Sequence, residues 1–270
     1  MCLSPVLIKN TNANILSKNT KFSDLYDTTT QYIQVPCGRC PVCVALRQQY
    51  IVQRVQMESL DNLIVFGTLT YNKATLPSLD VNGYPIKFAD VRHFQDMIRL
   101  IRKDNLLPDF RYMAVSEFGG KKHRPHWHFM LFYPKSAIVD DYRKLNKWHL
   151  DALQGQLWPI FLKYWRHNKG SRKYPDWQPN CDFHQTKYFR NYDLQIVDTI
   201  SSDCSDSAFY VTKYSTKSSD YVDRLKSAIR LNTSENDFKE IWQKIKPRFL
   251  FSKGFGNYHS PLVADQCKDL

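Results

Sequence analysis

Two histidines separated by one residue are the most chemically suggestive feature of this sequence. They are His126 and His128, which flank Trp127 in an apolar stretch. On a β-strand, side chains two residues apart lie on the same face, so both imidazoles would point the same way and Trp127 would point into the opposite layer. Two adjacent imidazoles can chelate a divalent cation, although such a pair alone is more often ordinary polar surface.

A carboxylate near the end of the preceding apolar stretch could complete this pair. Glu117 ends an alternating segment, and a hairpin through residues 119–125 would return it beside His126 and His128. Two imidazoles and one carboxylate leave coordination positions open for water and phosphate oxygens, as a catalytic Mg²⁺ or Mn²⁺ requires. We therefore predict that Glu117, His126 and His128 are metal ligands.

Two tyrosines further along the chain have the spacing of helix neighbours. Tyr210 and Tyr214 are four residues apart in an expected short helix over residues 207–217, so they would project from the same side. Lys213 lies next to them and supplies a cation for phosphate charge. The alternative is that both tyrosines are amphipathic side chains at a contact between a helix and a sheet.

The seven cysteines are unevenly distributed, and three of them form a C-x2-C-x2-C run at Cys37, Cys40 and Cys43. An odd count argues against a disulfide framework. A tetrahedral Zn²⁺ needs four ligands, so we expect Cys2 as the fourth ligand of a structural zinc site. The alternative is a set of inert buried thiols.

The elements that must position these residues follow from hydrophobic periodicity. Residues 72–84 contain Pro, Asn and Gly and are expected to form a loop. We expect strands at residues 63–71, 111–118, 126–133 and 194–200. We expect helices at residues 44–60, 88–102 and 207–217, a mainly helical segment at 140–163, and one or two helices within 220–245.

Composition points to a polyanionic partner. The chain has 38 Lys and Arg against 26 Asp and Glu, a net charge of +12, and 14% aromatic residues that can stack on unpaired bases. No apolar run approaches 18 residues and the first residues do not resemble a signal peptide, which argues against a membrane or secreted protein and for a reducing cytoplasm. A basic and aromatic stretch over residues 161–192 is either a single-strand path or a solvated insertion. Its candidate DNA-binding residues are Lys163, Arg166, Arg172, Lys173, Lys187 and Arg190.

Taken together, these features resemble the replication initiators of the HUH endonuclease superfamily, in which a His-hydrophobic-His strand precedes a tyrosine on a downstream helix. The resemblance is closest to the initiators of small circular single-stranded DNA phages, the microviruses, and to their gokushovirus branch. Landmarks follow the family order over nearly the whole chain: Met1-Cys2-Leu3, Pro36-Cys37-Gly38-Arg39-Cys40 with Cys43, Thr68-Leu69-Thr70-Tyr71, Glu117-Phe118-Gly119, Arg124-Pro125-His126-Trp127-His128, Tyr210-Val211-Thr212-Lys213-Tyr214 with Lys217, and Ser252-Lys253-Gly254-Phe255-Gly256.

The resemblance implies an α+β fold, with a central antiparallel sheet and helices packed on it as in ferredoxin-like nucleases. To this fold we add an N-terminal Cys-rich segment like a zinc knuckle and helical appendages. Since no internal repeat or linker is evident, residues 1–270 are expected to form a single HUH endonuclease domain. Within it, we expect a Cys-rich segment plus helix at 1–60, the nuclease core at 61–218, and a C-terminal helical extension and tail at 219–270.

The resemblance also implies an activity: metal-dependent nicking and joining of single-stranded DNA through a 5′-phosphotyrosine, as in rolling-circle replication. The catalytic residues would be Tyr210, Tyr214 and Lys213, and the metal Mg²⁺ or Mn²⁺. The expected partners are single-stranded DNA at a replication origin and the host helicase and polymerase, in the cytoplasm of an infected bacterium, with neither a membrane nor a small-molecule substrate. Two alternatives remain: a non-enzymatic single-strand binder, and a relaxase or single-strand transposase of the same superfamily.

Overall fold

The computed structural model describes residues 3–9, 32–38, 40–120, 122–141, 144–171, 173–180, 194–197 and 220–256. The chain divides into two compact units, residues 1–50 and residues 51–270. Within the first unit, β1 (Val6–Lys9) pairs antiparallel with β2 (Tyr32–Val35), and the first half of α2 (Pro41–Ser59) follows. The second unit contains the second half of α2 and all of the elements described below.

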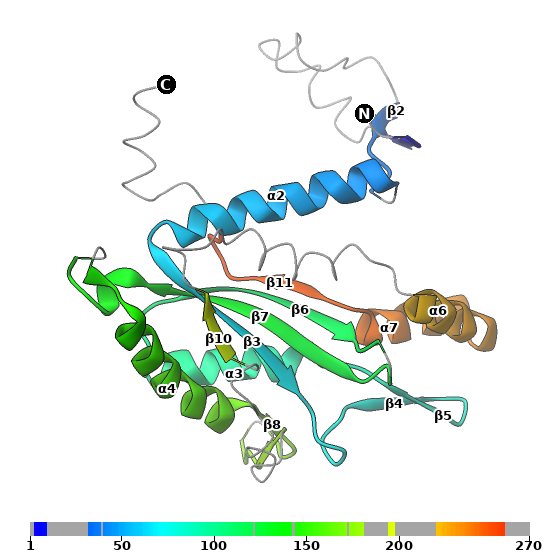
Figure 1. The fold of residues 1–270 in the computed structure, drawn as a ribbon. Helices are drawn as coiled ribbons and strands as arrows, with labels where there is room; N and C mark the ends of the chain where they lie inside the picture. The colour runs from blue at the N-terminus through cyan, green and yellow to red at the C-terminus, as the bar shows by residue number, and fades with distance from the viewer. Residues whose placement is uncertain are drawn as a thin grey trace, which may run out of the picture. The chain divides into compact units, whose positions relative to one another are not determined.

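The centre of the second unit is a five-stranded antiparallel sheet (Figure 1). The fold is therefore α+β, as the sequence predicts. The long middle strand β7 pairs with β3 on one side and with β6 on the other. The strand order is β10 (Leu194–Val197), β3 (Asn62–Thr70), β7 (Pro125–Pro134), β6 (Arg111–Phe118) and β11 (Phe249–Phe251).

Two helices, α3 (Val91–Lys103) and α4 (Lys147–Tyr164), cover one face of this sheet. Helix α3 begins at Asp90, whose side chain accepts a hydrogen bond from the backbone N–H of Arg92 at 2.8 Å. Its apolar residues recur at intervals of three and four and form one buried stripe, which packs against Trp127 and Phe129 of β7. This layer is the larger of the two cores beside the sheet.

The opposite face of the sheet carries a smaller core. Ile51, Val52 and Val55 from the second half of α2 pack there with strand residues and with Phe255. The side chain of Arg54 donates hydrogen bonds to the carbonyl oxygen of Phe255. Gly256, at φ +68°, approaches Arg54 so closely that a Cβ atom there would collide with it. These contacts explain why glycine stands at this position near the end of the described chain.

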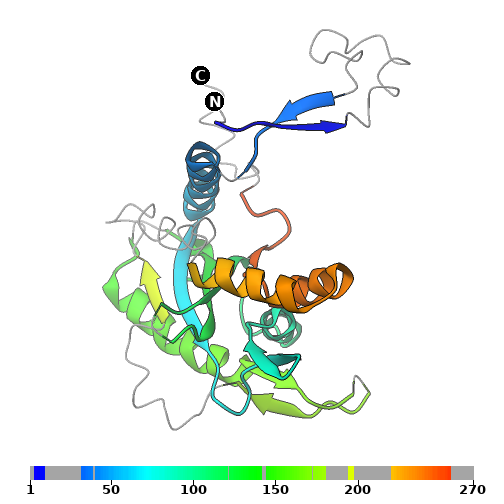
Figure 2. The same cartoon turned by 90° about the vertical axis from the view of Figure 1, so that its right-hand side faces the viewer.

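A third apolar cluster joins a helix pair to a β-hairpin. Helices α6 (Asp220–Asn232) and α7 (Glu235–Ile245) lie side by side (Figure 2), and Ile229, Phe238 and Ile245 are buried between them. Leu79 of β4 (Ser78–Val81) and Ile86 of β5 (Tyr84–Lys87) pack against this cluster.

Most predicted elements are present, with three differences, and the helix predicted at residues 207–217 lies outside the described residues. The expected loop at 72–84 contains β4 and begins β5, because the short chain reversal at Asn82 and Gly83, both at positive φ, lets the flanking residues pair. The helix expected from residue 140 begins only at Lys147, after the Asn146 side chain caps it. Pairing also produces strands that the sequence did not suggest: β1, β2, β8 (Arg166–Asn168), β9 (Trp177–Pro179) and β11. Among the described residues, no helix is long and apolar enough to cross a membrane.

Candidate functional site

The three predicted metal ligands of the sheet converge on one point. The Nε2 atom of His126 lies 2.6 Å from Oε1 of Glu117, and Nε2 of His128 lies 3.0 Å from the same oxygen. The two Nε2 atoms are 3.1 Å apart. Donor atoms this close around one centre are what a single cation needs.

Strand register brings these side chains together. Glu117 of β6 lies directly opposite His126 of β7, and Val115 lies opposite His128. Residues opposite one another in an antiparallel pair share a face, as do residues two apart along a strand. All three ligands therefore lie on one face, while Trp127 is fully buried on the other and anchors the strand.

Hydrogen bonds at the far side of each imidazole fix its orientation. Nδ1 of His128 lies 2.9 Å from Oγ1 of Thr68 on β3, and Nδ1 of His126 lies 3.1 Å from the carbonyl oxygen of Arg124. A carbonyl only accepts, so Nδ1 of His126 carries the proton and its Nε2 presents a lone pair to the centre. This is the arrangement of metal-binding histidines, whose other nitrogen is held by a hydrogen bond.

The carboxyl group of Glu117 is held in its ionised form. Burial by itself raises the pKa of Glu117, but the hydrogen bonds and positive charge that His126 and His128 supply when their Nε2 atoms are protonated outweigh burial, so the pKa of Glu117 is lowered. The three side chains are only 7–16% exposed. Two imidazole lone pairs and a carboxylate at this separation repel one another unless a proton or a cation lies between them.

The dimensions of the cluster fit an octahedral divalent ion. Mg²⁺ prefers ligands at about 2.1 Å in octahedral geometry, which separates neighbouring donor atoms by about 3.0 Å. The observed separations of 2.6, 3.0 and 3.1 Å match three neighbouring positions of such an octahedron. Three further positions would remain for water or for phosphate oxygens.

A second group of potential ligands lies in the N-terminal unit. The sulfur atoms of Cys37, Cys40 and Cys43 all lie within 4.8 Å of one another, and those of Cys37 and Cys43 are 4.0 Å apart. Around a tetrahedral zinc with Zn–S bonds of about 2.3 Å, two sulfurs would be separated by about 3.8 Å. Cys40 and Cys43 are brought close because α2 begins between them, with the Val44 N–H donating to the Cys40 carbonyl.

The thiol of Cys40 is acidic. Backbone hydrogen bonds from Cys43 and then Leu3, together with bonds from the neighbouring cysteines, outweigh burial and lower its pKa to about 6. Leu3 is also the residue next to Cys2 in the sequence. The hydrogen bond from Leu3 therefore places the residue next to Cys2, the predicted fourth ligand, at this cluster. Cys2 itself lies outside the described residues.

Several other predicted site residues also lie outside the described part of the chain. They include both candidate nucleophiles and the lysine beside them: Tyr210, Lys213 and Tyr214. The same holds for Arg172, Lys187 and Arg190. Lys163 is exposed on the last turn of α4, Arg166 is half-buried on β8, and Lys173 is exposed between β8 and β9.

Two residues that orient the site, Thr68 and Arg124, were not predicted as functional residues from the sequence. Thr68, which contacts His128, lies two residues before Thr70 on the strand that pairs with β7. Arg124 donates a side-chain hydrogen bond to the carbonyl oxygen of Tyr71 and so ties the start of β7 to the end of β3. A signal was available for Thr68, because a hydroxyl at that strand position faces the histidines if the two strands are paired.

Fold and site together define a class: an α+β protein whose antiparallel sheet carries a carboxylate–bis-histidine cluster suited to a divalent cation. Comparison with known proteins identifies the family. The model of the replication-associated protein ORF2 family matches residues 64–219, more than half of the chain, and this chain belongs to that family. The match includes Glu117, His126 and His128.

Two curated relatives come from phages. The chain is 28% identical over 98 residues to "Replication-associated protein VP4" of Bdellovibrio phage phiMH2K, covering 36% of this chain and 31% of that protein. It is 27% identical over 119 residues to "Replication-associated protein ORF4" of Chlamydia phage 1, covering 42% of this chain and 28% of that protein. The matched part therefore spans about a third or less of these relatives. No solved structure matches. These findings confirm the resemblance to microvirus replication proteins.

Proposed function

We propose that this protein initiates rolling-circle replication of a microvirus-like phage genome by nicking and rejoining single-stranded DNA. The observation that carries the proposal is the convergence of Glu117, His126 and His128 on one centre, inside the segment that the family model matches. A protein that only bound DNA would not need this donor set. In this proposal the sheet and its helices form an HUH nuclease core, which works in the cytoplasm of the infected bacterium with host helicase and polymerase.

The three ligands would hold Mg²⁺ or Mn²⁺, which when bound would polarise the scissile phosphate and offset its charge. Glu117 contributes a carboxylate whose ionised form is already favoured. His126 and His128 contribute lone pairs whose direction is fixed by Arg124 and Thr68. The buried ring of Trp127 behind them keeps the strand in place.

The nucleophile would be a tyrosine hydroxyl of Tyr210 or Tyr214. Its oxygen attacks phosphorus, the bond to the 3′ oxygen breaks, and the tyrosine becomes linked to the 5′ phosphate. The proton lost by the phenol balances the proton gained by the 3′ hydroxyl, which is then available to a polymerase. A phenol has a pKa of about 10, so the positive charge of Lys213 would favour the reactive phenolate. The phosphotyrosine linkage retains the energy of the broken phosphodiester bond, so the strand can be rejoined, and a second tyrosine allows a second cleavage.

The test is covalent capture. Protein, Mn²⁺ and labelled circular single-stranded DNA are mixed and separated on a denaturing gel. We expect a labelled protein band that is absent when the metal is chelated. Tyr210→Phe and Tyr214→Phe should each retain some adduct or lose only the second, circle-releasing cleavage, and the double variant should form none. Tyr174→Phe, at an exposed tyrosine between β8 and β9, is the matched control.

Two outcomes would contradict the proposal. An adduct in the double variant would assign the nucleophile to another residue. Tight single-strand binding without any adduct, in the presence of either metal, would favour the non-enzymatic binder.

For the N-terminal unit we propose a structural zinc, held by Cys37, Cys40 and Cys43 with Cys2 as the fourth ligand. The support is the separation of the sulfurs and the acidity of Cys40, because zinc binds thiolates. A closed set of four sulfurs leaves no position for a substrate, so this ion would stabilise the fold and take no part in the reaction.

A further inference from the structure

A pocket of about 440 Å³ lies where the end of α4 meets the hairpin of β8 and β9. Its volume is within the range of sites that hold small organic groups. The lining combines apolar, aromatic and cationic side chains: Pro159, Leu162, Lys163, Arg166, Trp177 and Pro179.

The hairpin register places an aromatic ring and a cation on the same face of this pocket. Arg166 lies opposite Pro179, and Asn168 lies opposite Trp177, so Arg166 and Trp177 share a face. The guanidinium carbon of Arg166 is 5.4 Å from the centre of the Trp177 ring and 5.5 Å from that of Tyr164. The Nε–H group of Arg166 is buried and has no hydrogen-bond acceptor among the described residues. A buried donor of this kind is costly unless a ligand supplies the acceptor.

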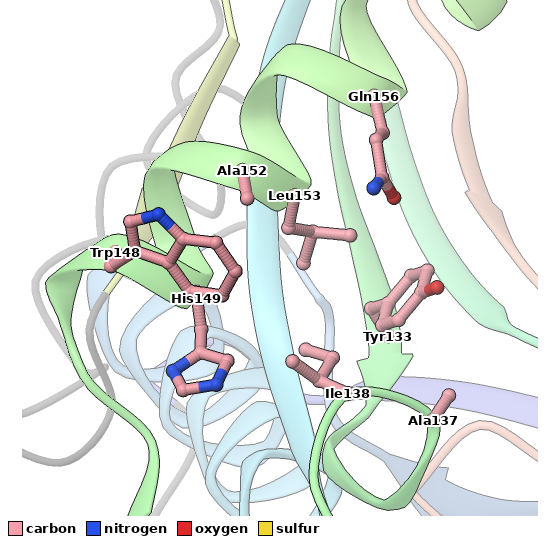
Figure 3. A pocket seen from close by; sticks show the side chains of 8 residues that line it. All are labelled: Tyr133, Ala137, Ile138, Trp148, His149, Ala152, Leu153 and Gln156. Carbon is pink, nitrogen blue, oxygen red and sulfur yellow. The ribbon is translucent and has the colours of Figure 1, made fainter.

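A second pocket along α4 shows what distinguishes the first. Its lining, drawn in Figure 3, consists of Tyr133, Ala137, Ile138, Trp148, His149, Ala152, Leu153 and Gln156. This pocket has a volume of about 200 Å³, contains an exposed tryptophan, and has no Lys or Arg in its lining. Both pockets can accept a flat ring, but only the first also offers charge to a phosphate.

Hydrogen bonds tie the first pocket to the strand end beside the metal ligands. The indole N–H of Trp165, next to Arg166, donates to the carbonyl oxygen of Thr70 at 2.7 Å. The N–H of Asn180, which follows Pro179, donates to the carbonyl of Trp165 at 2.9 Å. Thr70 is in turn paired with His126. The hairpin is thus held at the same end of the sheet as Glu117, His126 and His128, on the side of the opposite face, where Trp127 and α4 pack.

We propose that this pocket binds one unpaired nucleotide of the DNA substrate, with its base on Trp177 and its phosphate between Lys163 and Arg166. Stacking on an aromatic ring requires an exposed base face, which a base inside a duplex does not offer. The pocket therefore selects single-stranded DNA over duplex DNA. The identity of the polymer rests on the proposed function, whereas the chemistry of the pocket does not.

The test measures binding without chemistry. Binding of a short fluorescent oligothymidylate is followed by anisotropy in the presence of a metal chelator, so that no nicking occurs. Trp177→Ala should weaken binding by about 5- to 100-fold, as loss of one stacked base does. Trp177→Phe, which keeps a stacking ring, should bind within about threefold of the parent protein. Lys163→Gln should make the slope of log affinity against log salt less negative by about 0.7.

Matched controls make each result decisive. Trp148→Ala, in the pocket without cations, should bind DNA as the parent does, and duplex DNA should respond little to Trp177→Ala. The proposal fails if Trp177→Ala binds normally, if Trp177→Phe is as weak as Trp177→Ala while both melt like the parent, or if oligouridylate is bound more tightly than oligothymidylate. Because the chelator removes the reaction, a failure of adduct formation would leave this binding result standing.

Discussion

The two clusters of potential metal ligands differ in how the chain holds them. Glu117 and His126 come from neighbouring strands joined by a short link, and strand pairing in the sheet sets their separation. Cys37, Cys40 and Cys43 come from one turn and the first turn of one helix, so local spacing along the chain brings them together. One cluster depends on the tertiary fold, and the other requires little beyond its own segment.

The two clusters also differ in the chemistry of their donor atoms. Carboxylate and imidazole suit hard or intermediate ions and here would fill only part of a coordination shell, whereas thiolates suit zinc in a closed tetrahedron. A pre-formed, incomplete set of ligands on a rigid sheet suits catalysis, whereas a short sulfur-rich turn suits stabilisation of the fold. We therefore expect that substitutions can disable the two clusters separately.

The largest effect is expected at the sheet cluster. His126→Ala should reduce formation of the DNA adduct by about 1000-fold or more, equivalent to about 4 kcal/mol of transition-state stabilisation, because the remaining ligands hold a divalent ion poorly. Single-strand affinity should largely persist, since it rests on phosphate contacts and stacking. Quantitative gel analysis measures adduct formation, and fluorescence anisotropy measures single-strand affinity. His149→Ala, at a histidine of α4 outside the cluster, is the control, and normal adduct formation by His126→Ala would remove the metal site from the mechanism.

At the cysteine cluster the opposite pattern is expected. Cys40→Ser should lose the zinc, about one ion per chain by elemental analysis, and should increase hydrogen exchange in residues 32–50. The rate of adduct formation at low temperature should remain within about twofold of the parent rate. Cys267→Ser serves as the control cysteine outside the run. If the parent protein contains no zinc and its residues 32–50 are nevertheless protected from hydrogen exchange, the cysteines are only packed thiols.

A smaller effect on metal affinity is expected for Thr68, which orients a proposed metal ligand without binding the metal itself. Thr68→Val keeps the shape of the side chain but removes the hydroxyl that contacts Nδ1 of His128. Such outer contacts are worth about 10- to 100-fold in metal affinity. Manganese titration followed by electron paramagnetic resonance measures the change. Thr70→Val, at the strand position opposite His126, should change the affinity little, and equal effects of the two variants would argue against a specific role for Thr68.

The convergence of Glu117, His126 and His128 was predictable from the sequence for a physical reason. Alternation along a strand places His126 and His128 on one face, and a short link to the preceding strand leaves few registers in which Glu117 can lie elsewhere. The contact between Thr68 and His128 depends on pairing across 60 residues of sequence, which no local pattern specifies. The same limit applies to β11, which joins the sheet from far along the chain.

The β4–β5 and β8–β9 hairpins were missed for another reason. Their strands are only three or four residues long, and the segments that contain them include Pro, Asn and Gly, so composition alone indicates a loop. Contacts beyond the segment decide their structure: β4 and β5 pack on the helix pair, and Asn180 and Trp165, which flank the second hairpin, accept from Asn72 and donate to Thr70. The nucleotide pocket that we propose is built on that second hairpin.

The smallest expected effect is on the pH dependence of Cys40 alkylation. Because backbone N–H groups of Cys43 and Leu3 stabilise its thiolate, Cys40 has a pKa of about 6, so its thiol loses its proton as the pH rises through 6. In zinc-free protein, alkylation of Cys40 by iodoacetamide should therefore rise between pH 5 and pH 7 and level off above, whereas in the urea-unfolded chain the rise should centre near pH 8.5. At pH 7 the gain in rate is only about two- to fourfold, because a less basic thiolate is also a weaker nucleophile.

Replacing the backbone donor gives this last prediction its control. Leu3→Pro removes the N–H that contacts Cys40, so its pKa should rise and the alkylation midpoint should move toward higher pH. Tandem mass spectrometry distinguishes Cys40 from Cys43 in the same peptide. An unshifted midpoint would mean that the N-terminal residues do not reach the cysteine cluster, and it would weaken the assignment of Cys2 as its fourth ligand.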